Sequence, residues 1–213
     1  MIIAVDGPAG AGKGSLCSAL QEHFGFAKLD TGLLYRAVGM KVLRDGNDPE
    51  DPVAAEAAAL GLESNELDDP ALRSDEAGQA ASKVGAVPGV RAALLEFQQD
   101  FANNPPDGAK GAILDGRDIG TAVCPHADVK FYITASTEIR AKRRYKELLD
   151  RGHKAIYATV FEDMKMRDAR DQGRADAPMA KADDALLLET DEMDIPQVVS
   201  AALEFINSKT TET

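Results

Sequence analysis

A glycine-rich loop near the amino terminus constrains this chain more than any other feature. Residues 7–15 read GPAGAGKGS and lie between a short apolar segment, Ile2–Asp6, and a segment with helical periodicity, Lys13–Phe24. Glycines let backbone N–H groups curl around phosphate oxygens, and a helix that begins at the loop adds the positive end of its dipole. The pattern predicts a strand, a phosphate-binding loop and a helix, with a purely structural turn as the alternative.

The residue after the loop lysine departs from the commonest form of this pattern. In many nucleotide triphosphatases a hydroxyl residue follows the lysine directly, whereas here Gly14 follows and Ser15 comes one later. This spacing resembles that of small kinases which phosphorylate nucleoside monophosphates. We expect Lys13 to be exposed when no ligand is bound and to act as a point charge on a phosphoryl group. The expected donor-binding residues of the loop are Gly7, Pro8, Ala9, Gly10, Ala11, Gly12, Lys13, Gly14 and Ser15.

Strand and helix patterns alternate along the rest of the chain. Further strands are expected at 26–29, 112–114, 129–133 and 185–188, and helices at 33–43, 136–149, 157–171 and from Asp194 onward. Strands separated by helices predict an α/β fold with one doubly wound parallel sheet of about five strands. The stretch 52–102 is rich in alanine and interrupted by glycine, which predicts an inserted, mostly helical lobe.

Composition excludes several classes of partner. The 213 residues carry 24 Lys and Arg against 36 Asp and Glu, so the net charge is -12 and a nucleic-acid polymer is an unfavourable partner. No signal peptide or membrane span fits the sequence, and Cys17 and Cys124 lack metal-type spacing. We expect a cytoplasmic protein with two free thiols and no membrane or nucleic-acid partner.

Two polar segments follow predicted strands. Residues 29–36 read LDTGLLYR, and residues 112–121 read AILDGRDIGT. Asp115 ends an apolar strand, where phosphoryl-transfer enzymes place the carboxylate that holds the water shell of Mg²⁺. The predicted metal site is Ser15 and Asp115, acting through water. A turn cap at Asp115 and a helix cap at Asp30 or Thr31 are the alternatives.

Four motifs together resemble those of the bacterial cytidylate kinases. They are LDTGLLYR at 29–36, ASKVGAVPGVR at 81–91, DGRDIGT at 115–121 and RDARDQGR at 167–174. The resemblance runs from Ile3 to about Ile206, although residues 62–72 are shorter than the β-rich insert of many relatives. It implies a P-loop kinase fold in one domain, 1–213, with a monophosphate-binding lobe at 52–102 and a short lid at 143–174.

The resemblance also implies roles for individual residues. Ser82, Arg91 and Asp118 would contact the cytosine base, which suits its chemistry because a carboxylate accepts from the N4 amino group and arginine donates to O2 and N3. Arginines would grip the phosphates, and Arg167 with Asp171 would address the sugar hydroxyls. The expected substrate-binding residues are Thr31, Arg36, Ser82, Arg91, Arg117, Asp118, Arg167, Asp171 and Arg174.

A basic run from Arg140 to Lys146 allows two interpretations. It can form the solvated face of a helix, or it can cover the phosphates or ring of ATP. Arg143 is the best single candidate for the second role.

The implied reaction transfers the γ-phosphoryl group of ATP to CMP or dCMP, with Mg²⁺, in a monomeric enzyme of pyrimidine metabolism. The expected catalytic residues are Lys13, Asp115, Arg117 and Arg174, and no general base is needed because the acceptor phosphate is already ionised. The alternatives are a small kinase acting on UMP, AMP or another metabolite, a GTP-binding switch, which usually carries an NKxD motif absent here, and a scaffold without catalysis.

Overall fold

The core of the molecule is a parallel five-stranded sheet. The computed structural model describes residues 1–152 and 154–211. The strands are β1 (Ile2–Asp6), β2 (Ala27–Asp30), β3 (Ala112–Asp115), β4 (Val129–Thr134) and β5 (Leu186–Glu189). Their order in the sheet is β2-β3-β1-β4-β5, with every neighbouring pair parallel. The predicted sheet of about five parallel strands is confirmed, and because the strands are parallel their carboxyl ends share one edge.

Helices follow the strands much as the periodicity predicts. They are α1 (Lys13–Phe24), α2 (Thr31–Arg44), α3 (Pro52–Leu60), α4 (Asp75–Val84), α5 (Pro88–Asn103), α6 (Thr137–Asp150), α7 (Tyr157–Gln172) and α8 (Ile195–Thr211). Local signals set several ends. Gly25 ends α1 at a φ of 66°, and the Ser136 hydroxyl caps α6 by accepting the N–H of Ile139 at 3.4 Å. Within the described ranges no helix has the length and apolar character needed to cross a membrane.

Both faces of the sheet are buried. Ile3 and Val5 of β1 point into a core shared with α1 and α8, whereas Ala4 points into a second core shared with α5. All three side chains are fully buried, as expected for a parallel sheet covered by helices on both faces. Cys17 and Cys124 are buried free thiols, as the sequence predicts.

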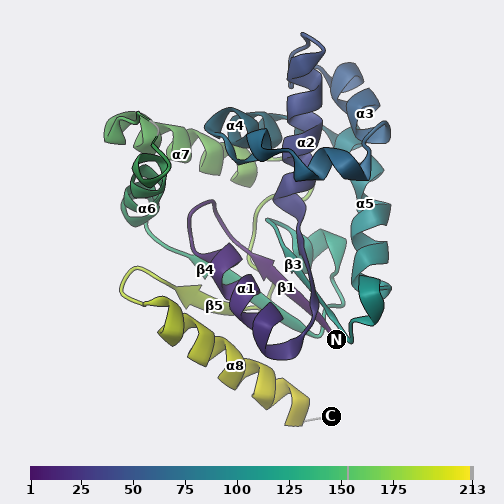
Figure 1. The fold of residues 1–213 in the computed structure, drawn as a ribbon. Helices are drawn as coiled ribbons and strands as arrows, with labels where there is room; N and C mark the ends of the chain where they lie inside the picture. The colour runs from purple at the N-terminus through teal and green to yellow at the C-terminus, as the bar shows by residue number, and fades with distance from the viewer. Residues whose placement is uncertain (153, 212–213) are drawn as a thin grey trace.

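Two helical units stand above the carboxyl edge of the sheet (Figure 1). One is the packed group α2, α3, α4 and α5, whose core includes Val38, Ala58, Val84 and Leu94. The other is the pair α6 and α7, which encloses a small core of its own around Met164. The first unit includes residues 52–102, predicted as the lobe, and the second includes most of residues 143–174, predicted as the lid; both assignments remain predictions. The short stretch 62–72 folds as two 3-10 turns, Ser64–Asp68 and Pro70–Arg73.

The crossing of α2 and α4 has no room for a side chain at Gly39. A Cβ there would lie 2.7 Å from the Cβ of Ala80 and 2.9 Å from its carbonyl carbon. We expect Gly39→Val to lower the free energy of unfolding by about 1–3 kcal/mol, because overpacking pushes the two helices apart. Urea unfolding measures the change. The matched control is Gly61→Ala, whose Cβ meets no atom closer than 3.4 Å. Equal stability of the two variants would contradict this account of the crossing.

Candidate active site

The loop between β1 and α1 has the backbone that its glycines allow. Gly7, Gly10 and Gly12 have φ values of 136°, 75° and 107°, which other residues rarely adopt. A Cβ at Gly7 would also collide with the carbonyl oxygen of Ile133 on β4. The loop is therefore held tightly at the carboxyl edge of the sheet, with the amino end of α1 at its close.

Lys13 is buried, so the expectation of an exposed ammonium group is wrong. Only 6% of the residue is exposed. Its Nζ donates to the carbonyl oxygen of Pro8 at 3.1 Å and lies 3.7 Å from Oδ1 of Asp115. Burial lowers the pKa of Lys13 to about 8, and the charge of Arg117 adds to the shift. An anion bound beside Nζ would stabilise the protonated form again.

A cavity of about 480 Å³ adjoins the loop. Its walls come from the loop and α1, from Arg143 on α6, and from the segment between β5 and the start of α8. Arg143 donates to the hydroxyl of Thr190 at 3.0 Å and to its carbonyl oxygen at 2.6 Å. The Thr190 hydroxyl in turn donates to the carbonyl oxygen of Ala11 in the loop. The structure thus places Arg143 in the wall of the cavity beside the loop, together with Thr190, which the motifs do not include.

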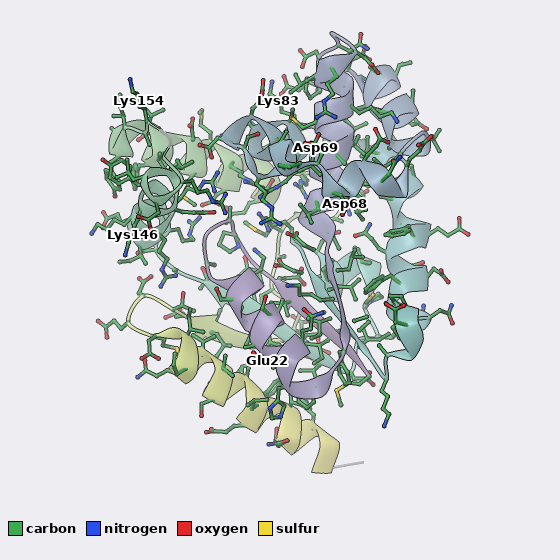
Figure 2. All side chains as sticks on the ribbon, in the orientation of Figure 1. Glu22, Asp68, Asp69, Lys83, Lys146 and Lys154 are labelled. Atoms are coloured by element: carbon green, nitrogen blue, oxygen red, sulfur yellow. The ribbon has the colours of Figure 1, made fainter. Side chains whose placement is uncertain are left out.

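The basic run on α6 serves two different purposes. Arg140 is buried, donates to the carbonyl oxygen of Ala9 at 3.2 Å and pairs with Asp168 of α7 at 2.6 Å. It therefore joins the loop before α1 to α7. Lys142 and Lys146 are exposed, and Figure 2 shows Lys146 on the outer side of these helices. The interpretation as a solvated helix face holds for these lysines and fails for Arg140.

Asp115 lies at the end of β3, opposite Asp30 in the register of β2. Its backbone carbonyl accepts the hydroxyl of Thr31 at 2.8 Å. Burial raises the pKa of Asp115 above its ordinary value, although Lys13 opposes the shift. No cluster of three or more His, Cys, Asp or Glu side chains suited to a metal exists within residues 1–152 and 154–211. One carboxylate and the hydroxyl of Ser15 suit Mg²⁺, which keeps several waters and takes further ligands from phosphates.

Several buried arginine nitrogens have no hydrogen-bond partner. Burying an unpaired charged donor is costly, so such atoms mark places where a ligand oxygen would be stabilised. Among the described residues the buried side-chain nitrogen and oxygen atoms without a hydrogen-bond partner are Arg36 Nε, Arg91 Nη1, Arg167 Nε, Arg170 Nη1 and Arg174 Nε. Four of these arginines were expected from the motifs, and Arg170 was not. Burial also lowers the pKa of Arg167 to about 9, with the charge of Arg117 adding to the effect.

Asp171 connects this arginine group. Its carboxylate lies 3.1 Å from Nε of Arg117, 2.7 Å from Nη2 of Arg174 and 3.9 Å from Nε of Arg167. It also accepts the hydroxyl of Ser82 at 2.8 Å. Ser82 belongs to α4, Arg117 follows β3, and the other members belong to α7 or follow it. The predicted sugar-binding carboxylate thus joins α4, the segment after β3 and the end of α7.

The three predicted base-contacting residues lie in two adjoining networks. Arg91 and Asp118 form a buried pair, with Nη2 2.6 Å from Oδ2. Asp176, which follows α7, adds a second carboxylate 3.3 Å from Nε of Arg91. Ser82 is bonded to Asp171 instead. The pair offers an arginine donor next to a carboxylate acceptor, and Nη1 of Arg91 has no hydrogen-bond partner.

The motifs do not identify three residues that the structure places at this site: Asp6, Asp176 and Thr190. Asp6 could have been predicted from the sequence, because it ends the apolar strand β1 as Asp115 ends β3. Thr190 directly follows β5, which is a weaker indication of the same kind. Asp176 lies in irregular chain between α7 and β5, where no periodicity identifies it.

Comparison with solved structures supports the fold. An uncharacterised protein from Eubacterium ventriosum has a TM-score of 0.57 at 17% identity, with 98% of each chain covered. A sugar kinase from Janibacter sp. has a TM-score of 0.51 at 11% identity, with 97% of this chain and 94% of that chain covered. At such identities the likeness concerns the fold alone.

Sequence comparison is far more specific. The cytidylate kinase family model matches residues 3–208. A cytidylate kinase of Paramagnetospirillum magneticum is 58% identical over 208 residues, 98% of each chain. One of Rhodospirillum rubrum is 56% identical over all of both chains. With the phosphate loop, the arginine group and the parallel sheet already in place, these matches show that the chain belongs to the cytidylate kinase family.

Proposed function

We propose that this enzyme transfers the γ-phosphoryl group of ATP to CMP or dCMP and releases ADP with CDP or dCDP. The surroundings of Lys13 carry the proposal, because its buried ammonium group lies 3.7 Å from Asp115 and the positive charges of Arg117 and Arg167 act on it, so an anion bound there would be stabilised. The loop and the cavity beside Arg143 would hold the donor. The arginines on α2, after β3 and on α7 would hold the acceptor.

Charge neutralisation is the main requirement of the reaction. An oxygen of the CMP phosphate forms a bond to the γ-phosphorus while the bond to the β–γ bridging oxygen breaks, so two anions have to meet in line. Lys13, Arg117 and Arg174 would stabilise the negative charge of the transferring group from fixed positions. No side chain has to take a proton, because the acceptor oxygen is already ionised at neutral pH.

Mg²⁺ would be held through water by Asp115 and Ser15, where it would draw charge from the β- and γ-phosphates. Thr31 supports this arrangement by fixing the backbone of Asp115 through the bond to its carbonyl oxygen. Burial of Lys13 and Asp115 keeps both charges out of bulk water and so strengthens their action on a bound phosphate.

Selection of cytosine would depend on the pair Arg91 and Asp118. The bond from Arg91 occupies Oδ2 of Asp118, which leaves Oδ1 to accept the N4 amino group. Uracil presents a carbonyl oxygen at that position, and a carboxylate would repel it. Arg167 and Asp171 would bind the sugar hydroxyls.

We also propose that the enzyme is monomeric and cytoplasmic and has no nucleic-acid partner. The net charge of -12 supports the last point, because it disfavours a polyanion.

A coupled assay with ATP and Mg²⁺ across CMP, dCMP, UMP and AMP tests the proposal. CMP and dCMP should be the preferred acceptors. Preference for AMP, or ATP hydrolysis without an acceptor, would contradict it.

Replacing Lys13 tests the phosphate loop. Lys13→Ala should reduce kcat at least about 10²-fold, because a charged donor to the transition state is lost. The protein should stay folded, since the change removes a buried charge and no apolar packing. Steady-state kinetics and a thermal melt measure both effects. Lys142→Ala, on the exposed side of α6, is the control and should leave kcat unchanged.

Replacing Arg36 tests the acceptor side. Arg36→Ala should lower kcat/KM for CMP about 10²-fold, as a desolvated charged contact is worth roughly 3 kcal/mol, and should alter KM for ATP little. Arg44→Ala on the same helix is the control, because half of that side chain is exposed. Comparable losses in both variants would mean that α2 contributes only stability.

Replacing Asp118 tests base selection. Asp118→Asn should lower kcat/KM for CMP about ten- to hundred-fold, through loss of a hydrogen bond worth roughly 1–3 kcal/mol. Activity with UMP should fall less or rise, because the amide can donate to the uracil carbonyl. If Asp118 only orients Arg91, activity with both nucleotides should fall together and the CMP/UMP ratio should stay unchanged.

A further inference from the structure

Asp6 is a buried carboxylate that the proposed reaction does not use. It ends β1, directly precedes Gly7 of the phosphate loop, and is 3% exposed. Its two oxygens are engaged separately. Oδ1 accepts the backbone N–H of Ile119 at 2.7 Å, and Oδ2 accepts that of Gly120 at 2.7 Å.

These two N–H groups open an unusual turn. Residues Ile119–Val123 form a single π-helical turn, a conformation that rarely persists without support from outside. Asp118 begins it, with its carbonyl oxygen accepting the N–H of Ala122 and of Val123. The first N–H groups of such a turn have no partner within it, and Asp6 satisfies them. A Cβ at Gly120 would lie 3.3 Å from Oδ2 of Asp6, so the fit is close.

The position of this turn decides where the base-selecting carboxylate lies. Asp118 directly precedes the two residues that Asp6 holds, and its side chain pairs with Arg91 at 2.6 Å. We propose that Asp6 is a positioning residue for cytosine recognition: its two hydrogen bonds hold the turn that aims Asp118 at Arg91 and at the base. The inference rests on the proposed function, since it assigns Asp118 to base selection. It also joins the acceptor site to the strand that carries the donor loop.

The protonation state of Asp6 should control the strength of its two hydrogen bonds to the turn. The charged and titratable groups facing it are Asp118, Lys13 at the start of α1, Tyr132 on β4 and Cys124 at the end of the turn. Lys130 of β4 also approaches Gly120 with its aliphatic chain, while its ammonium group donates to Pro125 and Asp184.

Burial raises the pKa of Asp6 to about 7, against the effect of the two N–H bonds. Above this pH the ionised carboxylate can accept both bonds. Below it, one oxygen carries a proton and becomes a weaker acceptor, so one of the two hydrogen bonds that hold the turn is weakened.

Asp6→Asn is the most informative variant, because the amide keeps the shape of the side chain and, like the protonated acid, is neutral and retains one carbonyl oxygen as an acceptor. At pH 8 its KM for CMP should rise about ten-fold relative to the wild type, as expected for the loss of a charge-assisted hydrogen bond. KM for ATP should change less than about two-fold, and the CMP deficit should shrink towards pH 6. Variants are compared at each pH because the phosphate of CMP itself titrates near pH 6.

Stability measurements separate positioning from a merely structural role. Because folding raises the pKa of Asp6, this group stabilises the folded wild type at pH values below its unfolded-state pKa. That contribution to the free energy of unfolding is lost as pH rises through about 7. The amide of Asp6→Asn does not titrate, so the variant does not lose stability in this way as pH rises. From pH 6 to pH 8 the variant should therefore gain stability relative to the wild type while its CMP deficit widens. A structural role would make stability and affinity move together.

The matched control is Asp128→Asn. Asp128 is an exposed aspartate whose Oδ2 accepts the N–H of Ile2, at the other end of β1, at 2.6 Å. Its variant should leave the ratio of the two KM values unchanged at every pH. If Asp6→Asn cannot be obtained folded, Asp6→Ser also removes the buried charge and the same outcomes are expected of it.

Two results would overturn the inference. One is an unchanged KM for CMP in the Asp6 variant, and the other is an equal rise in KM for both substrates with a parallel loss of stability at all pH values. Failure of the proposed function looks different, because the wild-type enzyme itself would then not prefer CMP.

Discussion

The carboxylate of Asp171, shared among the guanidinium groups of Arg117, Arg167 and Arg174, is the interaction on which the site depends. Burial by itself would raise the pKa of this carboxyl group, but the three positive charges outweigh it and the pKa is lowered. Asp115 and Asp30 also act on Arg117, and Asp168 acts on Arg167, yet burial and the charge of Arg117 still lower the pKa of Arg167. Around Arg167 the site therefore keeps a local surplus of positive charge, which a bound phosphate would relieve.

This local surplus contrasts with the net charge of -12 for the whole chain. The acidic exterior disfavours a polyanion, which would have to cover much of the surface, while a small phosphate compound has only to enter the site. Lys13 and Arg167 both have pKa values lowered mainly by burial, with the charge of Arg117 adding to the shift. Their full protonation is thus linked to the presence of an anion, as expected of a site that binds phosphates in exchange for water.

The sequence predicted the parts of this molecule that depend on neighbouring residues. The phosphate loop needs glycines at fixed offsets, and the buried strands need continuous apolar runs, so both are visible in a few consecutive letters. The exposure of Lys13 was mispredicted because its surroundings come from distant parts of the chain, including Asp115, which is more than a hundred residues away and lies 3.7 Å from Nζ. The ion pair between Arg140 and Asp168 was not predicted for the same reason. A run of basic residues on a helix has the same sequence pattern whether its side chains face water or a neighbouring helix.

The arrangement around Arg91 shows why long-range contacts, rather than motifs, set the direction of a functional group. The motifs identify the arginine and Asp118 but say nothing of which nitrogen is free. In the structure Asp118 takes Nη2 and Asp176 takes Nε, two nitrogens that share one edge of the guanidinium plane. Held along that edge, the group cannot rotate without breaking a charged contact, and Nη1 is left unsatisfied. Asp118 lies at the start of the turn after β3, and Asp176 lies in the chain after α7. Because these two carboxylates accept from Nη2 and Nε, Nη1 is the donor of Arg91 that remains available to a ligand.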